Sequence, residues 1–272
     1  MTRSVDVVIV NHNTADDLEA CLGSLQAAPP AGLQRITVVD NASTDGSPAR
    51  VASRWPTVNL IRLDRNVGFG AANNVALRRD GAPLALLLNS DTVVPPGAVD
   101  TLVDRLLATG AVAAGPRLVG RDGRPEISFG PMLSPAAEFM QRARVRLATS
   151  DRRWARRYED RLVSREREVA WVSGACLLLR RAPAIAAGLF DERYFMYEED
   201  VDLCAALRQR GGRILFTPRA EVVHARGASV ARAGQRATAD YDRSHLAFYE
   251  KHRPGWAPLL RLWLRLRGRA IR

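Results

Sequence analysis

The stretch VVDNASTDGS (residues 38–47) decides the fold, because a short apolar run ends there in Asp40 and then in a turn. Two other stretches, VVIVNHN (residues 7–13) and LLLNSDT (residues 86–92), likewise run from apolar residues into polar ones. Short apolar strands that alternate with helices indicate a mostly parallel sheet covered by helices on both faces. Ligands of such sheets bind beyond the carboxyl ends of the strands. The sequence therefore predicts an α/β fold with a binding site near Asp40 and Asp91.

The periodicity of apolar residues predicts the order of the elements. In the first half, strands are expected at residues 5–10, 36–39, 58–63 and 84–88, and helices at residues 15–27, 47–55, 71–79 and 97–108. In the second half we expect a hairpin turn at 121–124, an Arg-rich helical stretch at 141–168, a strand from 169, a short helix, a helix at 198–209, strands at 213–216 and 221–224, and a helical tail at 241–272 that breaks near 254–255. We therefore expect one α/β domain, residues 1–235, followed by a basic, amphipathic helical extension, residues 236–272.

Composition is that of a globular protein with a full core. The chain has 272 residues, of which 47% are hydrophobic, and a formal net charge of +11 from 40 basic and 29 acidic residues. Its three cysteines lack paired spacing, which fits a reducing compartment rather than a disulfide framework or a zinc site. We see neither a signal peptide nor an apolar run long enough to span a bilayer. We therefore expect a cytoplasmic protein with surface attachment at most.

Asp40 and the loop NVGFG (residues 66–70) are candidates for nucleotide binding. The carboxylate of Asp40 can accept hydrogen bonds from a base or a ribose, although it could also do no more than cap its turn. Backbone N–H groups of the loop could face phosphate oxygens at the start of the next helix. A plain helix start explains the loop equally well, because the Lys-Ser/Thr end of a P-loop is missing.

Asp91 is a candidate ligand for a divalent cation. Such a cation prefers carboxylate oxygens and keeps positions open for diphosphate oxygens, where its charge would neutralise a departing nucleoside diphosphate. An N-cap role near Pro95 would account for Asp91 but not for its alignment with Asp40. His224, at the end of a later strand, could supply an imidazole nitrogen to the same ion, although a lone histidine is more often structural.

A cluster of four carboxylates at residues 198–202 begins a predicted helix and complements its dipole. Helical spacing places Asp200 at the head of the apolar face, which packs inward. A partly desolvated carboxylate at the edge of a cleft is suited to take a proton from a hydroxyl group. Glu199 and Asp202 are expected to face solvent or to orient their neighbours.

Taken together, these stretches resemble the inverting family-2 glycosyltransferases, in the branch described as rhamnosyltransferase-like. The resemblance covers most of residues 5–224 in the family's order. It is carried by VVIVNHN (7–13), VVDNASTDGS (38–47), NVGFGAANN (66–74), LLLNSDT (86–92), WVSGACLLLRR (171–181) and GLFDERYFMYEEDVDLCAALRQRG (188–211).

The resemblance implies a GT-A fold, a nucleotide-sugar donor, a Mg²⁺ or Mn²⁺ ion and inversion at the anomeric carbon. Carried over by position, the resemblance implies that Asp40 binds the nucleoside, that Asp91 and His224 are metal ligands, and that Asp200 is the general base. We further predict donor contacts from Asn11, Asn13, Asn66, Gly68, Asn74, Asn89 and Ser90, and acceptor contacts from Trp171, Gly174 and Glu199. Core packing accounts equally well for Trp171 and Gly174. The sequence departs from the family pattern at Asn89, where an aspartate is common, so fewer charges would face the ion. His12 stands where an aromatic side chain is common.

The activity that follows from the resemblance is transfer of a sugar to a hydroxyl of a glycan or glycolipid acceptor during synthesis of cell-envelope polysaccharide. L-Rhamnose from a dTDP donor is the branch's commonest case. The Arg-rich stretch 141–168, which includes Arg152, Arg153, Arg156 and Arg157, is expected on the acceptor side.

The basic tail predicts contact with an anionic membrane beside a lipid-linked acceptor. Its arginines occupy one side of a helix and its large apolar residues another: Arg261, Arg265, Arg269 and Arg272 against Trp256, Leu259, Leu260 and Trp263. Two alternatives stay open, namely a tail docked on its own domain and a contact in a homodimer.

Other classes of protein explain the sequence less well. The net charge would suit a basic, non-enzymatic module that binds nucleic acid or membrane, but no nucleic-acid-binding signature is recognised and the carboxylates at strand ends would stay unexplained. We therefore expect no nucleic-acid partner. A nucleotidyltransferase would need a Gly-rich basic loop after the first strand. An inactive relative that only binds a nucleotide sugar is distinguished by an assay of donor hydrolysis.

Overall fold

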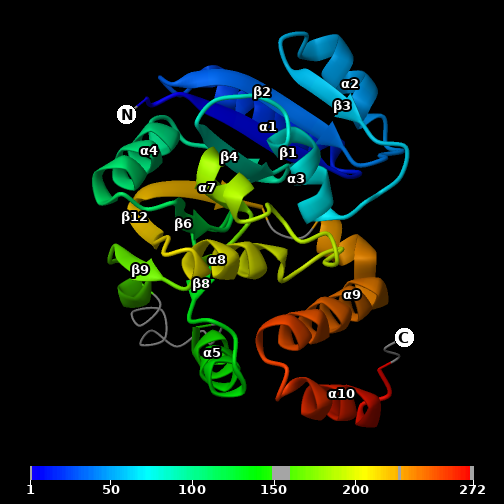
Figure 1. Cartoon of the computed structure of the whole chain (residues 1–272). Coiled ribbons are helices and arrows are strands. Elements are labelled where there is room, and N and C mark those ends of the chain that lie inside the picture. Colours follow the sequence, from blue (N-terminus) through cyan, green and yellow to red (C-terminus); the bar gives the residue numbers. More distant parts are fainter. Residues whose placement is uncertain (1, 149–159, 226–227, 270–272) are drawn as a thin grey trace.

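The computed structural model describes residues 2–148, 160–225 and 228–269, which form a central sheet with helices on both faces and a helical extension (Figure 1). The first half contains β1 (Val5–Asn11), α1 (Ala15–Ala27), β2 (Leu33–Asp40), α2 (Ser47–Arg54), β3 (Asn59–Arg62), α3 (Phe69–Leu77), β4 (Leu84–Asn89), β5 (Thr92–Val93) and α4 (Ala98–Thr109). The second half contains β6 (Ala113–Val119), β7 (Pro125–Glu126), β8 (Phe129–Gly130), α5 (Pro135–Ala148), β9 (Arg167–Val169), β10 (Trp171–Val172), β11 (Cys176–Arg180), α7 (Arg181–Ala186), α8 (Glu199–Gln209), β12 (Ile214–His224), α9 (Ala228–His252) and α10 (Ala257–Leu266).

The main sheet has the strand order β3-β2-β1-β4-β11-β6-β12-β5. Strands β3, β2, β1 and β4 are parallel neighbours, and β6 is parallel to β12. Strand β11 lies antiparallel between β4 and β6, and β5 is antiparallel to β12. The expectation of a mostly parallel α/β sheet is therefore confirmed, with β11 as the main exception.

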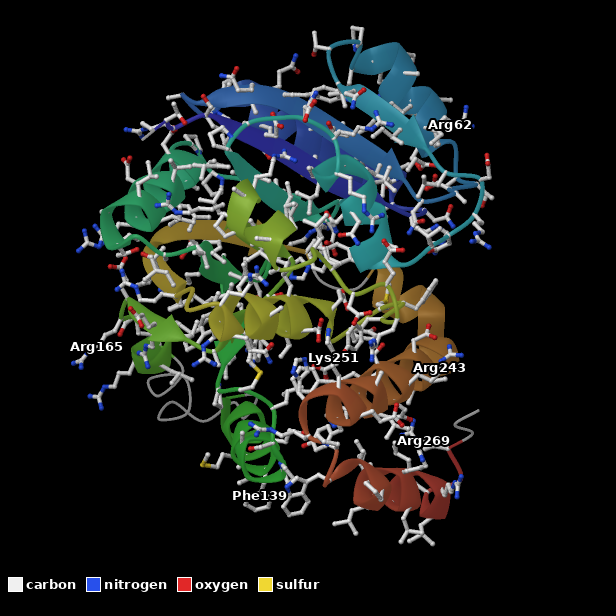
Figure 2. The ribbon with its side chains drawn as sticks, in the orientation of Figure 1. Arg62, Phe139, Arg165, Arg243, Lys251 and Arg269 are labelled. Carbon is white, nitrogen blue, oxygen red and sulfur yellow. The ribbon has the colours of Figure 1, made fainter. Side chains whose placement is uncertain are left out.

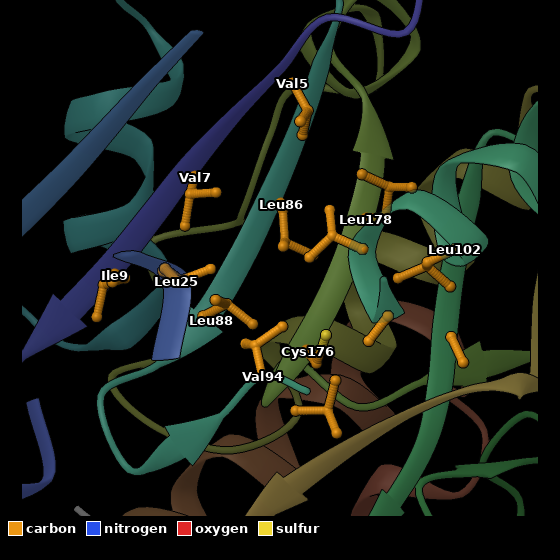
Figure 3. Close-up of a cluster of buried hydrophobic side chains, with 14 of the residues drawn as sticks. Val5, Val7, Ile9, Leu25, Leu86, Leu88, Val94, Leu102, Cys176 and Leu178 are labelled. Atoms are coloured by element: carbon orange, nitrogen blue, oxygen red, sulfur yellow. The ribbon is translucent and has the colours of Figure 1, made fainter. Parts of the chain in front are cut away.

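Two apolar clusters hold the helices to the sheet. There is one on each face of the sheet, because successive side chains of a strand point to opposite faces. Val7 and Ile9 face the layer of α1, α2 and α4, and Figure 3 shows them with Leu102 of α4. Val8 and Val10 face the layer of α3, α7 and α8. Burial of each such side chain contributes about 1.5–3 kcal/mol, so the two layers fix the strand ends that form the site.

The second half departs from the predicted pattern in two places. The strand expected from Val169 is divided into β9, β10 and β11, with a turn at Gly174 and Ala175 between the last two. The two strands expected at 213–216 and 221–224 form the single strand β12, whose register against β6 shifts between Thr217 and Glu221. Pro218 lies within that shift, where the missing N–H of proline is tolerated.

The C-terminal extension consists of α9 and α10, and the predicted break near residues 254–255 is confirmed. The boundary expected at residue 235 lies within α9. A third apolar cluster, which includes Leu246 and Phe248 of α9 and Leu264 of α10, packs against Tyr194 and Val201. Of the Arg-rich stretch, residues 141–148 belong to α5, whereas Arg152, Arg153, Arg156 and Arg157 lie outside the described residues. No helix in the described ranges is long and apolar enough to cross a membrane.

Candidate active site

The carboxyl ends of the parallel strands meet at one edge of the sheet, as the sequence predicts. Asn11 is paired in register with Asp40, and Val10 with Asn89. The side-chain amide of Asn11 donates to Asp40 Oδ1 at 3.0 Å, and the Thr14 hydroxyl is 2.7 Å from that of Ser90. Hydrogen bonds therefore connect the ends of β1, β2 and β4 into one polar edge.

A cavity of about 740 Å³ opens at this edge. Residues from distant parts of the chain line it, including the predicted metal ligands, the predicted base and all predicted acceptor contacts: Asp91, His224, Asp200, Trp171, Gly174 and Glu199. Four of the predicted donor contacts, Asn66, Gly68, Asn89 and Ser90, line it as well. The predicted metal ligands and the predicted base therefore line a single cavity.

Asp91 and His224 are neighbours because β5 pairs with β12. Thr92 lies opposite His224 in the register, and the N–H of Ala225 donates to the carbonyl of Asp91 at 2.8 Å. His224 Nε2 is 3.3 Å from Asp91 Oδ1, and His224 Nδ1 is 3.2 Å from Glu126 Oε2. The lone histidine that the sequence left open therefore stands beside the candidate metal carboxylate.

This pair has the donor atoms that a divalent cation requires. One carboxylate and one imidazole nitrogen would leave the remaining positions for diphosphate oxygens, and Glu126 would fix the ring from behind. Asn89 Nδ2 lies 3.4 Å from His224 Nε2, so the residue that departs from the family pattern touches the same site. Burial lowers the pKa of His224, but hydrogen bonds with Asp91 and Glu126 outweigh it and raise this pKa to about 9. The described residues contain no group of three His, Cys, Asp or Glu suited to a metal, so the protein alone offers an incomplete shell.

Asp200 lies in the first turn of α8, where it is half-buried at the wall of the cavity. Its Oδ2 accepts a hydrogen bond of 2.7 Å from the N–H of Gly174, and its Oδ1 accepts one of 2.8 Å from the N–H of Val201. Desolvation raises the pKa of Asp200 to about 6, and the charge of Glu198 adds to the increase. A carboxylate with this pKa is ionised at neutral pH and still basic enough to take a proton.

Glu199 and Asp202 are buried, so the expectation that they face solvent is wrong. Asp202 lies under the end of α9, and Glu199 lies against α3, where a Cβ added at Gly70 would be 3.4 Å from the Cβ of Glu199. Burial, together with the charge of Asp200, raises the pKa of Glu199 well above its usual range. Glu199 Oε2 has no hydrogen-bond partner among the described residues. The raised pKa favours the neutral form of Glu199, and in that form the side chain could donate a hydrogen bond into the cavity.

Asp202 orients neighbouring side chains, which was the alternative expected for it. Its carboxylate is 2.8 Å from Lys251 Nζ and 2.6 Å from His252 Nε2, both at the end of α9. The hydroxyl of Tyr194 donates to it at 3.2 Å. Asp202 thus connects α8 to the C-terminal extension.

The predicted donor contacts divide into two groups. Asn66 and Gly68 line the cavity, and Asn41, which the sequence did not single out, holds their loop by donating to Asn66 Oδ1 at 2.9 Å and to the Gly68 carbonyl at 3.2 Å. The other predicted contacts are not among the lining residues: Asn11, Asn13, Asp40 and Asn74. The fully buried amide of Asn74 donates to the carbonyl of Phe190 at 2.9 Å, which ties α3 to the segment before α8.

Helix α9 forms part of the cavity, which the sequence did not indicate. Tyr241 lines the cavity, and its ring stacks on the imidazole of His245 with centroids 5.4 Å apart. His245 Nδ1 is 3.1 Å from Glu198 Oε1, and His245 Nε2 is 3.2 Å from Glu138 Oε2. Both glutamates line the cavity. No local sequence signal marks this cluster, because its members come from three segments far apart in the chain.

The fold is that of the GT-A glycosyltransferases. The solved structure described as "GalNAc-T7 with UDP, GalNAc and Mn²⁺" superposes with a TM-score of 0.61 and 17% identity, over 82% of this chain and 43% of that chain. A mannosyltransferase from Pyrobaculum calidifontis in complex with GDP-Man and Mn²⁺ gives a TM-score of 0.60 and 20% identity, over 94% of this chain and 68% of that chain. This chain thus spans less than half the length of the GalNAc-T7 chain, and at these identities the likeness concerns the fold alone.

The sequence comparisons give the family. The model for "Glycosyl transferase family 2" matches residues 6–186. The "N-acetylglucosaminyl-diphospho-decaprenol L-rhamnosyltransferase" of Mycobacterium tuberculosis is 33% identical over 282 residues, which cover 95% of this chain and 89% of that protein. The "O-antigen biosynthesis protein RfbC" of Myxococcus xanthus is 26% identical over 91% of this chain but only 19% of that protein. The chain belongs to glycosyl transferase family 2, and it is a glycosyltransferase.

Proposed function

We propose that the protein transfers L-rhamnose from a dTDP donor to a hydroxyl of a lipid-linked N-acetylglucosamine acceptor, with inversion, at the inner face of the cell membrane. The observation that carries the proposal is the shared cavity. Asp91 and His224 lie together in it, and Asp200 lines it beside Trp171, Gly174 and Glu199, the predicted acceptor contacts. The name of the mycobacterial relative supports the sugar and the acceptor, since that protein aligns over 95% of this chain.

The proposed reaction is a single displacement. The oxygen of the acceptor hydroxyl forms the bond to the anomeric carbon, the bond from that carbon to the diphosphate oxygen breaks, and the hydroxyl proton passes to Asp200. The backbone N–H of Gly174 holds the Asp200 carboxylate in place during this transfer. A divalent cation held by Asp91 and His224 would supply positive charge beside the departing diphosphate.

The remaining wall residues position the acceptor. Glu199, as a neutral carboxyl, can donate a hydrogen bond to a second sugar hydroxyl without competing with Asp200 for the proton. Trp171, whose indole N–H donates to the carbonyl of Pro131 at 2.9 Å, presents a fixed ring to the cavity. A fixed ring suits the apolar face of a sugar.

The test is a transfer assay with purified protein. The donors are dTDP-L-rhamnose, UDP-GlcNAc and GDP-mannose, the acceptor is a short-chain N-acetylglucosaminyl-diphospho-lipid, and each reaction is run with Mn²⁺, with Mg²⁺ and with chelator. We expect product only from the rhamnosyl donor, loss of product with chelator, and an inverted anomeric configuration by NMR. Equal use of the three donors, or a retained configuration, would contradict the proposal.

A further inference from the structure

Most of the large apolar side chains that are exposed in the described residues belong to two helices of the acceptor side. On α5 they are Phe139, which is 75% exposed, and Met140. On and beside α10 they are Trp256, Leu259, Leu262, Trp263 and Leu266, the last being 79% exposed. Figure 2 shows Phe139 at the same end of the molecule as the side chains of α10.

Helix α10 docks on α9 through a different face from the one it exposes. Ala257 and Leu264 are buried in the cluster with Tyr249, and Leu260 packs against it. At 100° per residue, these positions lie on one side of the helix and the exposed residues on another. The exposed apolar face of α10 therefore stays open after the tail has packed on its own domain. Packing within the chain does not explain why this face is apolar.

The two helices are joined by the same apolar cluster. Leu133, just before α5, packs against that cluster, and the side chain of Arg253, between α9 and α10, donates to its carbonyl at 3.3 Å. The Tyr249 hydroxyl donates to Glu138 on the first turn of α5. Phe139 is the next residue after Glu138, which lines the cavity. The exposed apolar face thus begins beside the cavity that would receive the acceptor.

The charged side chains of the segment that carries α10 are all basic, although two of its arginines, Arg261 and Arg269, pair with Glu250 and Asp242 of α9. Residues 251–272 contain no acidic residue. Arg265 is exposed and has no acidic partner among the residues that the structure describes, and the guanidinium of Arg267 lies 4.0 Å from the centre of the Trp263 ring. A second copy of this chain would bring two such basic surfaces together, whereas an anionic bilayer would complement them.

We propose that α5 and α10 form one membrane-docking face, in which Phe139, Met140 and the open face of α10 enter the headgroup region of an anionic phospholipid bilayer. Arg265 contacts the lipid phosphates, and the mouth of the cavity faces the bilayer beside α5. The relation of the cavity to a lipid-linked acceptor rests on the proposed function, but the docking itself does not. Two residues of this face, Phe139 and Met140, belong to α5, which precedes α10 by more than a hundred residues in sequence.

The test is co-sedimentation of the full chain with vesicles of phosphatidylcholine, with or without phosphatidylglycerol. We expect binding to the anionic vesicles, a loss of about tenfold or more in partitioning for Phe139→Ser or for Leu262→Ser with Leu266→Ser, and a loss of about fivefold or more for Arg265→Glu. The matched controls are Ile185→Ser on α7, an apolar residue that is 51% exposed, and Arg62→Glu at the far end of the molecule in Figure 2. Both controls should bind like the original protein.

Three results would overturn the inference. They are unchanged binding of Phe139→Ser, equal binding to neutral and anionic vesicles, and conversion of a dimer to a monomer by these substitutions in light scattering. The experiment needs neither donor nor acceptor, so it separates docking from the proposed function. In the transfer assay, the docking variants should still use a water-soluble short-chain acceptor and lose activity only on acceptor embedded in vesicles; an equal loss on both would also count against the docking face.

Discussion

His245 holds Glu198 at the start of the helix that carries the candidate base, with 3.1 Å between His245 Nδ1 and Glu198 Oε1. Glu198 has a left-handed backbone with φ of 66°, and the preceding Tyr197 has φ of 70°. Two such residues in succession are strained by roughly 1–3 kcal/mol each, so they persist only where contacts fix them. Ser244 adds a second contact from α9, because its hydroxyl donates to the carbonyl of Met196 at 2.7 Å. The extension therefore maintains the turn that leads to Asp200.

Replacement of His245 should affect both stability and the reaction. In His245→Gln, Glu138 and Glu198 lose a shared cation in a buried place, and we expect destabilisation of about 3 kcal/mol with a lower kcat. Denaturant unfolding gives the first quantity and the transfer assay the second. Arg243→Gln, an exposed site on the same helix, is the control, and it should change neither by a comparable amount.

The same residue predicts how stability depends on pH. Burial lowers the pKa of His245, but its bonds with Glu138 and Glu198 outweigh burial and raise this pKa from 6.5 to about 9. The contribution of a group whose pKa is raised on folding is complete below the unfolded pKa and is lost as the pH passes through the folded pKa. Melting temperature should fall between about pH 6.5 and pH 9, and that part of the fall should be absent from His245→Gln. Parallel curves for the two proteins would refute this assignment.

Asp200→Asn should abolish transfer and leave donor binding intact, because the amide keeps the shape of the carboxylate but cannot accept the proton. We expect a loss of about 10²–10⁴-fold in kcat and an unchanged Kd for the nucleotide sugar by calorimetry. In the original protein, kcat/KM should rise with pH with an apparent pKa near 6, as the pKa of Asp200 implies. Near-normal turnover of the variant would remove Asp200 from the role of base.

Glu199→Gln is the isosteric counterpart and should behave differently. The pKa of Glu199 is raised well above 4.5, so stability due to the neutral form is complete in acid and decreases as the pH rises through the folded pKa. The amide removes this decrease, and the variant should melt at a higher temperature than the original protein at about pH 8 but not at about pH 4. Transfer should be retained within about tenfold, because the amide can still donate a hydrogen bond. A loss as large as that of Asp200→Asn would indicate that Glu199 takes the proton.

Gly68→Ala should destabilise the protein by several kcal/mol, more than the conformational penalty alone. Gly68 has φ of 90°, and an added Cβ would lie 2.3 Å from the carbonyl oxygen of Phe195. Gly46→Ala is the matched control, because Gly46 has φ of 83° and nothing within 4 Å of the added Cβ. Its penalty should stay near 1–2 kcal/mol. Equal unfolding free energies for the two variants would show that the backbone at Phe195 moves to relieve the clash, at little cost in stability.

The sequence predicted the elements that follow local rules. The apolar runs at β1, β2 and β4 end where expected. The end of each strand is determined locally, because turn-forming residues directly follow the apolar residues of the strand. The convergence of Asp40, Asn89 and Asp91 at one edge followed from parallel pairing alone. The contact of His224 with Asp91 could not be predicted in that way, because it depends on the pairing of β5 with β12.

The errors come from interactions that are remote in sequence. Helical periodicity correctly placed Asp200, half-buried, at the edge of the cavity, but it assigned Glu199 and Asp202 to solvent, because periodicity contains no information about the elements that pack against the helix. For Asp202 that element is α9, whose Lys251 and His252 pair with it, and for Glu199 it is α3, which carries Gly70. The role of Tyr241 and His245 in the cavity was missed for the same reason.

The way in which α9 enters the cavity wall bears on how relatives with different acceptors could be recombined. Tyr241 and His245 meet Tyr197, Glu198 and Glu138, so these side chains must match one another as a set. A chimera that exchanges the last forty or so residues by themselves would break that match, whereas one that exchanges α5 and the turn before α8 along with them would carry the acceptor preference of the parent from which they came.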